Sequence, residues 1–158
     1  MKQLVLTGLA GAAALTAVTV WAGSAKEEPL ALTVLGEVVD AAMIDHGETI
    51  YAENCASCHG TKLEGQPDWR RRLENGRMPA PPHDADGHTW HHADRPLFTI
   101  TKRGVGAVVP GYDSDMPAFE GILTDAEIVA TLAYIKSTWP ERERAFQAEV
   151  TANDEGGK

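Results

Sequence analysis

The chain has 158 residues, a length that suits one domain. Its 14 Lys+Arg against 23 Asp+Glu give a formal net charge of −9, which argues against nucleic acid as a partner because phosphate binding needs a basic face. The two cysteines, Cys55 and Cys58, are too few for a disulfide framework or for a four-cysteine zinc or iron–sulfur site within the chain.

The first 25 residues have the pattern of a targeting segment. Lys2 precedes an uncharged apolar run from Leu4 to Gly23, and small residues at 22–25 suit a signal peptidase. A run of about 20 apolar residues also suffices to span a bilayer. We expect residues 1–25 to be a cleaved signal peptide or an N-terminal membrane anchor through residues 4–23, with a buried core helix as the third interpretation. Either of the first two places the remainder outside the cytoplasm, soluble in the periplasm or tethered to the membrane.

Residues 26–37, which include Pro29, are predicted to form a linker to a domain of residues 38–140. Apolar side chains at helical spacing predict a helix from about Val38 to Cys55. Residues 60–96 hold five prolines and several glycines, so loops and short helices are expected there, with one short helix over residues 96–102.

The last predicted helix of the domain begins after Thr124. Thr124 and Glu127 have the spacing of a capping box, and Pro140 stops the apolar helical pattern that follows. Residues 141–158 are mostly charged and polar, and we expect them to form a tail that extends into solvent. With no alternating strand pattern of useful length, the domain is predicted to be mostly helical.

Both cysteines fall in Cys55-Ala56-Ser57-Cys58-His59, which has the form Cys-x-x-Cys-His of a c-type haem attachment motif. The two thiols can each add to one haem vinyl group, which places His59 beneath the iron as an axial ligand. A thioredoxin-like redox pair would need a βαβ pattern nearby. A disulfide between these positions would close a very small loop and stabilise little. The sequence therefore predicts one covalent haem c.

The motif resembles that of the mono-haem class I c-type cytochromes, together with Gly47, Tyr51, the segment Met116-Pro117-Ala118-Phe119 and the helix after Thr124. The resemblance covers roughly residues 38–139. It implies an all-α cytochrome c fold, in which a few helices and long loops wrap one covalent haem. It also implies that the first and last helices cross at Gly47, with Tyr51, Leu132 and Ile135 near the crossing.

The sixth iron ligand is predicted to be Met116. The resemblance places a distal methionine in the loop just before the last helix, where Met116 lies, and methionine in that position raises the reduction potential. Met78 also precedes a proline in a loop but follows His59 closely, and Met43 is expected to pack in the core. Core packing of Met116 beside an open or His-ligated iron remains the alternative.

Two polar segments admit more than one interpretation. The histidine-rich loop either binds a second metal, copper or zinc, or wraps the haem with its histidines and Trp90; its histidines are His83, His88, His91 and His92. The basic cluster either pairs with haem propionates, forms a docking patch, or is a solvated surface run; its members are Arg70, Arg71, Arg72 and Arg77.

These features predict an electron-transfer protein that carries one electron on haem c with His59 and Met116 as axial ligands, and that is not itself an enzyme. Its partners would be redox proteins that donate and accept the electron. The alternative is a haem c subunit of a membrane oxidase or dehydrogenase complex. Two further alternatives are a redox or gas sensor with a labile sixth ligand, and a copper-handling protein.

Overall fold

A computed structural model describes residues 31–156, so the predicted targeting segment lies outside the described residues. The elements in chain order are β1 Thr33–Val34, β2 Glu37–Val38, α1 Ala41–Asn54, α2 Ala56–His59, η1 Thr89–His91, α3 Asp94–Arg103, η2 Val105–Ala107, α4 Asp125–Ser137 and α5 Glu141–Gly156. The predicted all-α class is confirmed, since β1 and β2 are only two residues long each and pair as a small antiparallel hairpin. Within residues 31–156, no helix has the length and apolar character needed to cross a membrane.

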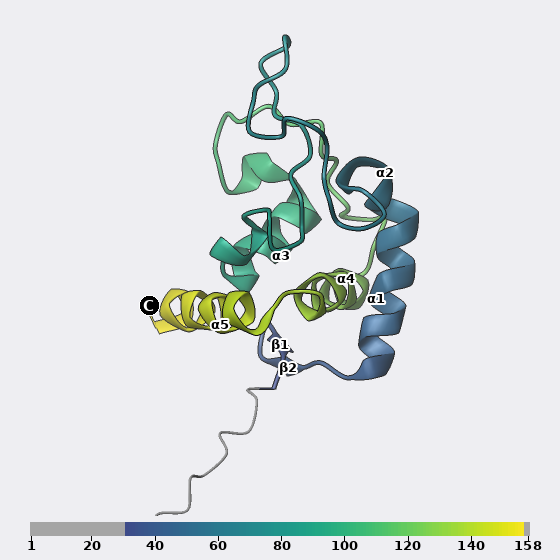
Figure 1. The fold of residues 1–158 in the computed structure, drawn as a ribbon, viewed down its shortest axis with the longest axis vertical. Coiled ribbons are helices and arrows are strands. Elements are labelled where there is room, and N and C mark those ends of the chain that lie inside the picture. The colour runs from purple at the N-terminus through teal and green to yellow at the C-terminus, as the bar shows by residue number, and fades with distance from the viewer. Residues whose placement is uncertain (1–30, 157–158) are drawn as a thin grey trace, which may run out of the picture.

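Helix α1 runs along one side of the molecule and packs against α4, while long loops gather at the end opposite the hairpin (Figure 1). A Cβ atom built on Gly47 would lie 1.9 Å from the carbonyl oxygen of Ala130 and 3.0 Å from the Cβ of Tyr134. Only glycine therefore allows the helices to approach this closely, as the family resemblance implied. Tyr51 and Ile135 pack together in a buried cluster beside this crossing.

The capping box at the start of α4 is also confirmed. The Glu127 N–H donates to Thr124 Oγ1 at 3.3 Å, and Glu127 Oε2 accepts the Thr124 N–H at 2.7 Å. The helix then buries Ile128, Leu132 and Ala133 against Val34 of β1 and Leu97 of α3. These contacts build one of the two buried apolar clusters from segments far apart in the sequence.

Two sequence predictions about the ends of the chain are wrong. Residues 33–37 of the predicted linker form the hairpin together with Val38, and the Val34 side chain is fully buried. Residues 141–156 of the predicted tail form α5, which buries Glu143 and Gln147. The folded body therefore extends beyond residues 38–140 on both sides.

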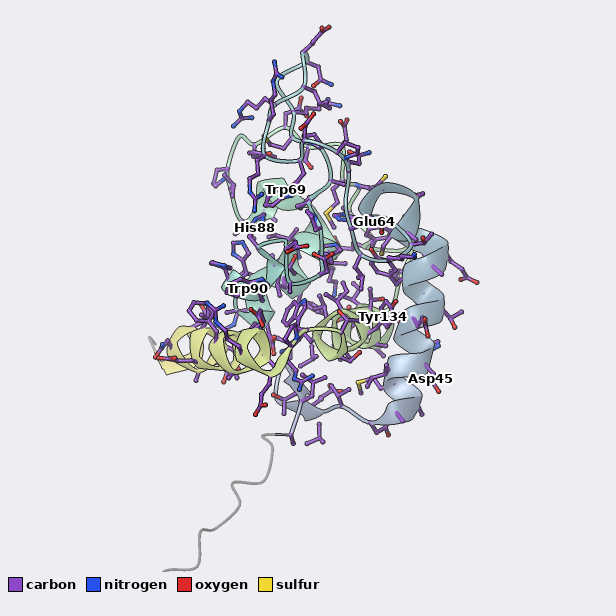
Figure 2. The ribbon with its side chains drawn as sticks, in the orientation of Figure 1. Asp45, Glu64, Trp69, His88, Trp90 and Tyr134 are labelled. Carbon is purple, nitrogen blue, oxygen red and sulfur yellow. The ribbon has the colours of Figure 1, made fainter. Side chains whose placement is uncertain are left out.

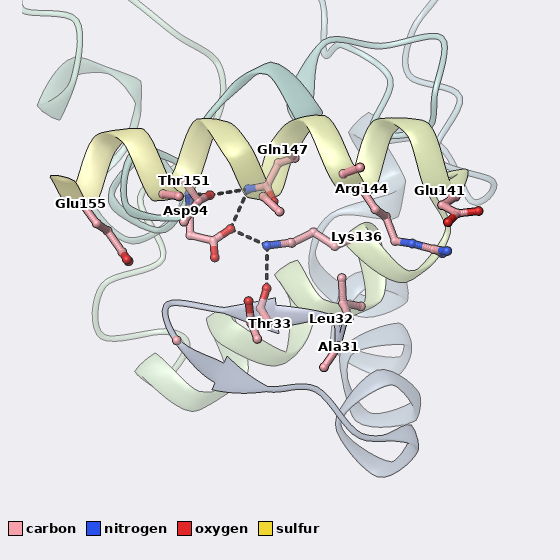
Figure 3. A pocket seen from close by; sticks show the side chains of 14 residues that line it. Ala31, Leu32, Thr33, Asp94, Lys136, Glu141, Arg144, Gln147, Thr151 and Glu155 are labelled. Carbon is pink, nitrogen blue, oxygen red and sulfur yellow. Dashed lines mark hydrogen bonds and ion pairs between the residues drawn. The ribbon is translucent and has the colours of Figure 1, made fainter. Parts of the chain in front are cut away.

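A buried polar network explains why both ends pack onto the domain (Figure 3). Lys136 Nζ lies 2.6 Å from Asp94 Oδ1 and donates to the carbonyl oxygen of Thr33 at 2.6 Å. Gln147 Nε2 donates to the same carboxylate oxygen at 2.7 Å, and the Leu35 N–H donates to Asp94 Oδ2 at 2.9 Å. A buried ion pair needs such extra hydrogen bonds, because desolvation otherwise outweighs the attraction. Burial lowers the pKa of Lys136, and the nearby Asp94 opposes that effect.

Candidate cofactor site

The cysteine motif occupies a sharp corner between two helices. Cys55 caps the end of α1, and α2 follows as a single turn in which the His59 N–H donates to the Cys55 carbonyl at 2.9 Å. This turn places Cys55 and Cys58 three residues apart on one side of the helix. Both thiols are free; Cys55 is half-buried and Cys58 is exposed. Burial raises the pKa of Cys55 to about 11, which keeps its thiol protonated at neutral pH.

The imidazole of His59 is buried and has one ring nitrogen already engaged. Its Nδ1 lies 2.8 Å from the carbonyl oxygen of Pro81. Because a carbonyl can only accept, Nδ1 carries the proton and Nε2 keeps its lone pair. Burial lowers the pKa of His59, against the opposing effect of the Pro81 bond, and so favours the neutral ring. A neutral imidazole fixed through Nδ1 is the usual arrangement of a metal-binding histidine.

A second histidine, His83, packs against this ring. The two ring centroids are 4.0 Å apart with an interplanar angle of 21°. The His83 Nδ1 is 2.9 Å from Thr89 Oγ1, and the His83 carbonyl accepts the indole N–H of buried Trp139 at 2.7 Å. Burial lowers the pKa of His83 well below its ordinary value, with a smaller effect of the neighbouring His59. His83 is therefore neutral, and its contacts hold the Pro81 segment against the cysteine motif.

The glycine after His59 completes the corner. Gly60 has a φ of 84°, a region that glycine enters without strain. Its carbonyl oxygen accepts the hydroxyl of Tyr51 at 3.0 Å, which ties the turn to the middle of α1. The motif is thus held from two sides, by α1 through Tyr51 and by the loop through Pro81.

Met116 lies in a separate loop between η2 and α4, and its side chain is half-buried. The Met116 N–H donates to Ser114 Oγ at 3.1 Å. Just beyond it, the N–H of buried Phe119 donates to the carbonyl of Thr101 in α3 at 3.1 Å. The loop is therefore fastened to α3 immediately after the methionine. Met43, the alternative on α1, packs against the Val34–Leu97 core cluster as expected.

The histidine-rich loop uses its rings for packing. His88 stacks on Trp69, with centroids 5.4 Å apart and an interplanar angle of 8° (Figure 2). Trp90 lies edge-on to Phe146 of α5 at 5.4 Å. Across residues 31–156, no three His, Cys, Asp or Glu side chains converge as a metal site would require. The copper or zinc interpretation of this loop gains no support from the structure.

The four arginines of the basic cluster make different contacts. Arg70 lies over the Trp69 ring, 4.2 Å from its centroid. Arg72 donates to the carbonyl of Gly76 in its own turn at 2.7 Å, and Arg71 is exposed. Arg77 pairs with two aspartates of the Met116 loop, and Arg70 also donates to the Asp86 carbonyl at 3.4 Å. The cluster is therefore not a single surface run.

A cavity of about 730 Å³ lies elsewhere, between the hairpin and α5 (Figure 3). It borders the Asp94–Lys136 pair and is lined in part by Thr33, Arg144 and Gln147. No residue of the cysteine motif lines it. At the motif, two free thiols beside a neutral imidazole fit a covalently attached haem.

Sequence reasoning missed Pro81 and His83 as neighbours of His59. The Pro81 contact is made by a backbone carbonyl, which leaves no side-chain signal in a sequence. His83 stood among four histidines, and nothing in the spacing set it apart.

Comparison with known proteins finds a matching family model and several similar proteins. The Cytochrome c family model matches residues 44–139. Two forms of the Cbb3-type cytochrome c oxidase subunit CcoP from Rhodobacter capsulatus are 29% and 31% identical over 107 residues, 67% of this chain and 33% of theirs. The subunit of the same name from Azospirillum brasilense is 30% identical over 96 residues, 61% of this chain and 28% of its own. The chain thus spans about a third of the length of these relatives. No solved structure matches it significantly.

Proposed function

The chain belongs to the cytochrome c family, and we propose on that premise that it carries one electron on a single haem c held by Cys55, Cys58, His59 and Met116. When bound, the haem supplies an iron that alternates between ferric and ferrous states. Cys55 and Cys58 would anchor it through thioether bonds. His59 and Met116 would occupy the two axial positions.

The observation that carries this proposal is the hydrogen bond between His59 Nδ1 and the Pro81 carbonyl. It lies directly behind a turn that presents two free thiols. This bond orients the ring, leaves Nε2 unprotonated and makes the imidazole a stronger donor. Such an arrangement leaves Nε2 free to bind a metal.

Met116 supports electron transfer in a different way. Its thioether is a soft ligand that raises the reduction potential relative to a second imidazole. With both axial positions taken, the chain would pass electrons without binding a substrate at the iron. Cys58 is exposed, so a haem attached there would be accessible to a redox partner.

A second function is favoured by the relatives, which are named as subunits of a Cbb3-type oxidase. On that alternative this domain would be a haem c subunit that delivers electrons to a membrane oxidase. Residues 4–23 would act as its membrane tether, and the domain would lie on the periplasmic side. Both alternatives use the same four residues and differ in whether the partner is permanent.

Intact mass spectrometry under denaturing conditions tests the cofactor directly. The parent protein, produced with haem maturation, should retain the mass of one haem. The double variant Cys55→Ser, Cys58→Ser should retain none, whereas Ser57→Ala, the matched control in the same turn, should match the parent. Loss of haem from the denatured parent would contradict covalent attachment.

Native electrophoresis of detergent-solubilised membranes separates the two alternatives. A haem-stained band at the mass of the chain alone supports a free or tethered carrier. Comigration with an oxidase that reduces oxygen supports the subunit.

A further inference from the structure

Five consecutive residues, 77–81, contact both His59 at the end of α2 and the loop that carries Met116. At one end of this segment the Pro81 carbonyl lies 2.8 Å from His59 Nδ1. At the other end the Arg77 guanidinium pairs with Asp113 and Asp115. Asp115 immediately precedes Met116.

The contact from Arg77 has the geometry of a clamp. Its Nε and Nη2 lie 3.0 Å and 2.9 Å from one oxygen of Asp113, while Nη1 pairs with Asp115. The planar guanidinium fixes the directions of all these donors at once. The Arg77 guanidinium therefore holds two carboxylates that lie two residues apart along the chain and would otherwise repel one another.

Arg77 is itself fixed by its own turn. The Arg77 N–H donates to Asn75 Oδ1 at 3.0 Å, and the Arg77 carbonyl accepts from the Leu73 N–H at 2.9 Å. At the base of this projecting loop, the Gln66 N–H donates to the Ala80 carbonyl at 2.9 Å. The guanidinium therefore extends from a loop that its own hydrogen bonds hold in place, so it can position the Met116 loop.

The Met116 loop needs support on the side that Arg77 contacts. After the methionine, backbone bonds from Phe119 and Glu120 fasten the chain to α3. Before the methionine, the side chains of residues 108–115 are exposed or half-buried, with Val108 and Val109 at 40% and 47% relative exposure. Burial contributes little to holding this stretch, and the pairs with Arg77 restrain it.

We propose that Arg77 is a positioning residue for Met116: its pairs with Asp113 and Asp115 hold the loop so that the thioether stays in reach of the iron. This inference rests on the proposed axial role of Met116. Loss of the clamp lets the loop move away more often, so an external ligand competes better for the sixth position. Exposed ion pairs contribute modestly, and Asp113 and Asp115 are 73% and 55% exposed. We therefore expect a change of roughly three- to tenfold in external-ligand affinity.

Imidazole binding to the ferric holoprotein tests this, with Arg77→Gln compared against Arg71→Gln. The control removes the same charge from the same loop at an exposed residue. Arg77→Gln should bind imidazole roughly three- to tenfold more tightly than the parent, and Arg77→Lys should fall between them, because a lysine keeps the charge without the fork. Arg71→Gln should match the parent. High salt should reduce the difference between Arg77→Gln and the parent, because it screens exposed pairs.

The outcomes also separate this inference from the proposed function. If the parent shows the weak red absorption of methionine bound to ferric haem, but Arg77→Gln and Arg71→Gln bind imidazole equally, the clamp is refuted and the electron-carrier proposal stands. If Arg77→Gln lowers the melting temperature without changing imidazole affinity, Arg77 is structural and the inference fails. If the parent itself lacks the methionine absorption, both the Met116 ligation and the clamp are refuted.

Discussion

The crossing of α1 and α4 offers a sharp test of the fold, because it depends on the absence of one methyl group. We expect Gly47→Ala to destabilise the protein, although alanine is the better helix former. The added Cβ would lie 1.9 Å from the Ala130 oxygen and 2.5 Å from its carbonyl carbon. Both are backbone atoms in the middle of α4, so no side-chain rotation relieves the contact and one helix must shift.

The magnitude follows from two opposing effects. Forcing an extra carbon into a packed interface costs about 1–3 kcal/mol. Replacing glycine by alanine within a helix returns up to about 1 kcal/mol. Because the blocking atoms belong to the backbone, we place the packing cost at the upper end, which leaves a net loss of about 2 kcal/mol. In a domain of this size, that corresponds to a fall of roughly 6 °C in the melting temperature.

Thermal and urea unfolding of the holoprotein, followed by far-ultraviolet circular dichroism, would measure the change. Gly156→Ala is the matched control, since Gly156 also lies in a helix but a Cβ added there would meet no heavy atom within 4 Å. That variant should stay within about 0.5 kcal/mol of the parent. A Gly47→Ala protein as stable as the parent would refute the close approach of the two helices.

Two further predictions concern buried polar groups. Lys136→Met should destabilise the protein by about 3–5 kcal/mol in a urea titration, because it leaves the buried Asp94 carboxylate without its cation. Lys102→Met breaks a more exposed pair and should cost less than about 1 kcal/mol in the same titration. Equal losses of stability in the two variants would contradict the buried network. Burial raises the pKa of Tyr51 well above its ordinary value of 10.0. The unfolded chain therefore loses that proton first, and stability should fall as the pH rises above about 10. Tyr51→Phe should be less stable at neutral pH, by about 1 kcal/mol for the lost hydroxyl bond, but should show a shallower alkaline decline, and an unchanged decline would refute the role of this group.

The parts of the molecule that the sequence predicted correctly are those marked by side-chain chemistry. Thr124 and Glu127 form the capping box through their own side chains, and Gly47 allows the helix crossing because it has none. The structure places them as expected because such signals are local.

The parts that were missed lack such signals. Helix α5 buries Glu143 and Gln147 in place of an apolar stripe, so its pattern is that of a solvated segment. The hairpin turns at Leu35 and Gly36, with φ values of 51° and 84°, and leucine is not a residue that predicts such a turn. Both elements pack onto the buried Asp94–Lys136 pair, a contact between residues far apart in the sequence.

The central claim is that one haem with His59 and Met116 as axial ligands carries the electron. A potentiometric titration of the holoprotein, followed through its visible spectrum, tests it most directly. We expect a single one-electron wave, with a slope of about 59 mV per tenfold change in the oxidised-to-reduced ratio. We also expect the red methionine absorption in the oxidised form, and both that absorption and the high potential should be lost in Met116→Ala. A Met116→Ala protein with the spectrum and potential of the parent would contradict this ligand assignment.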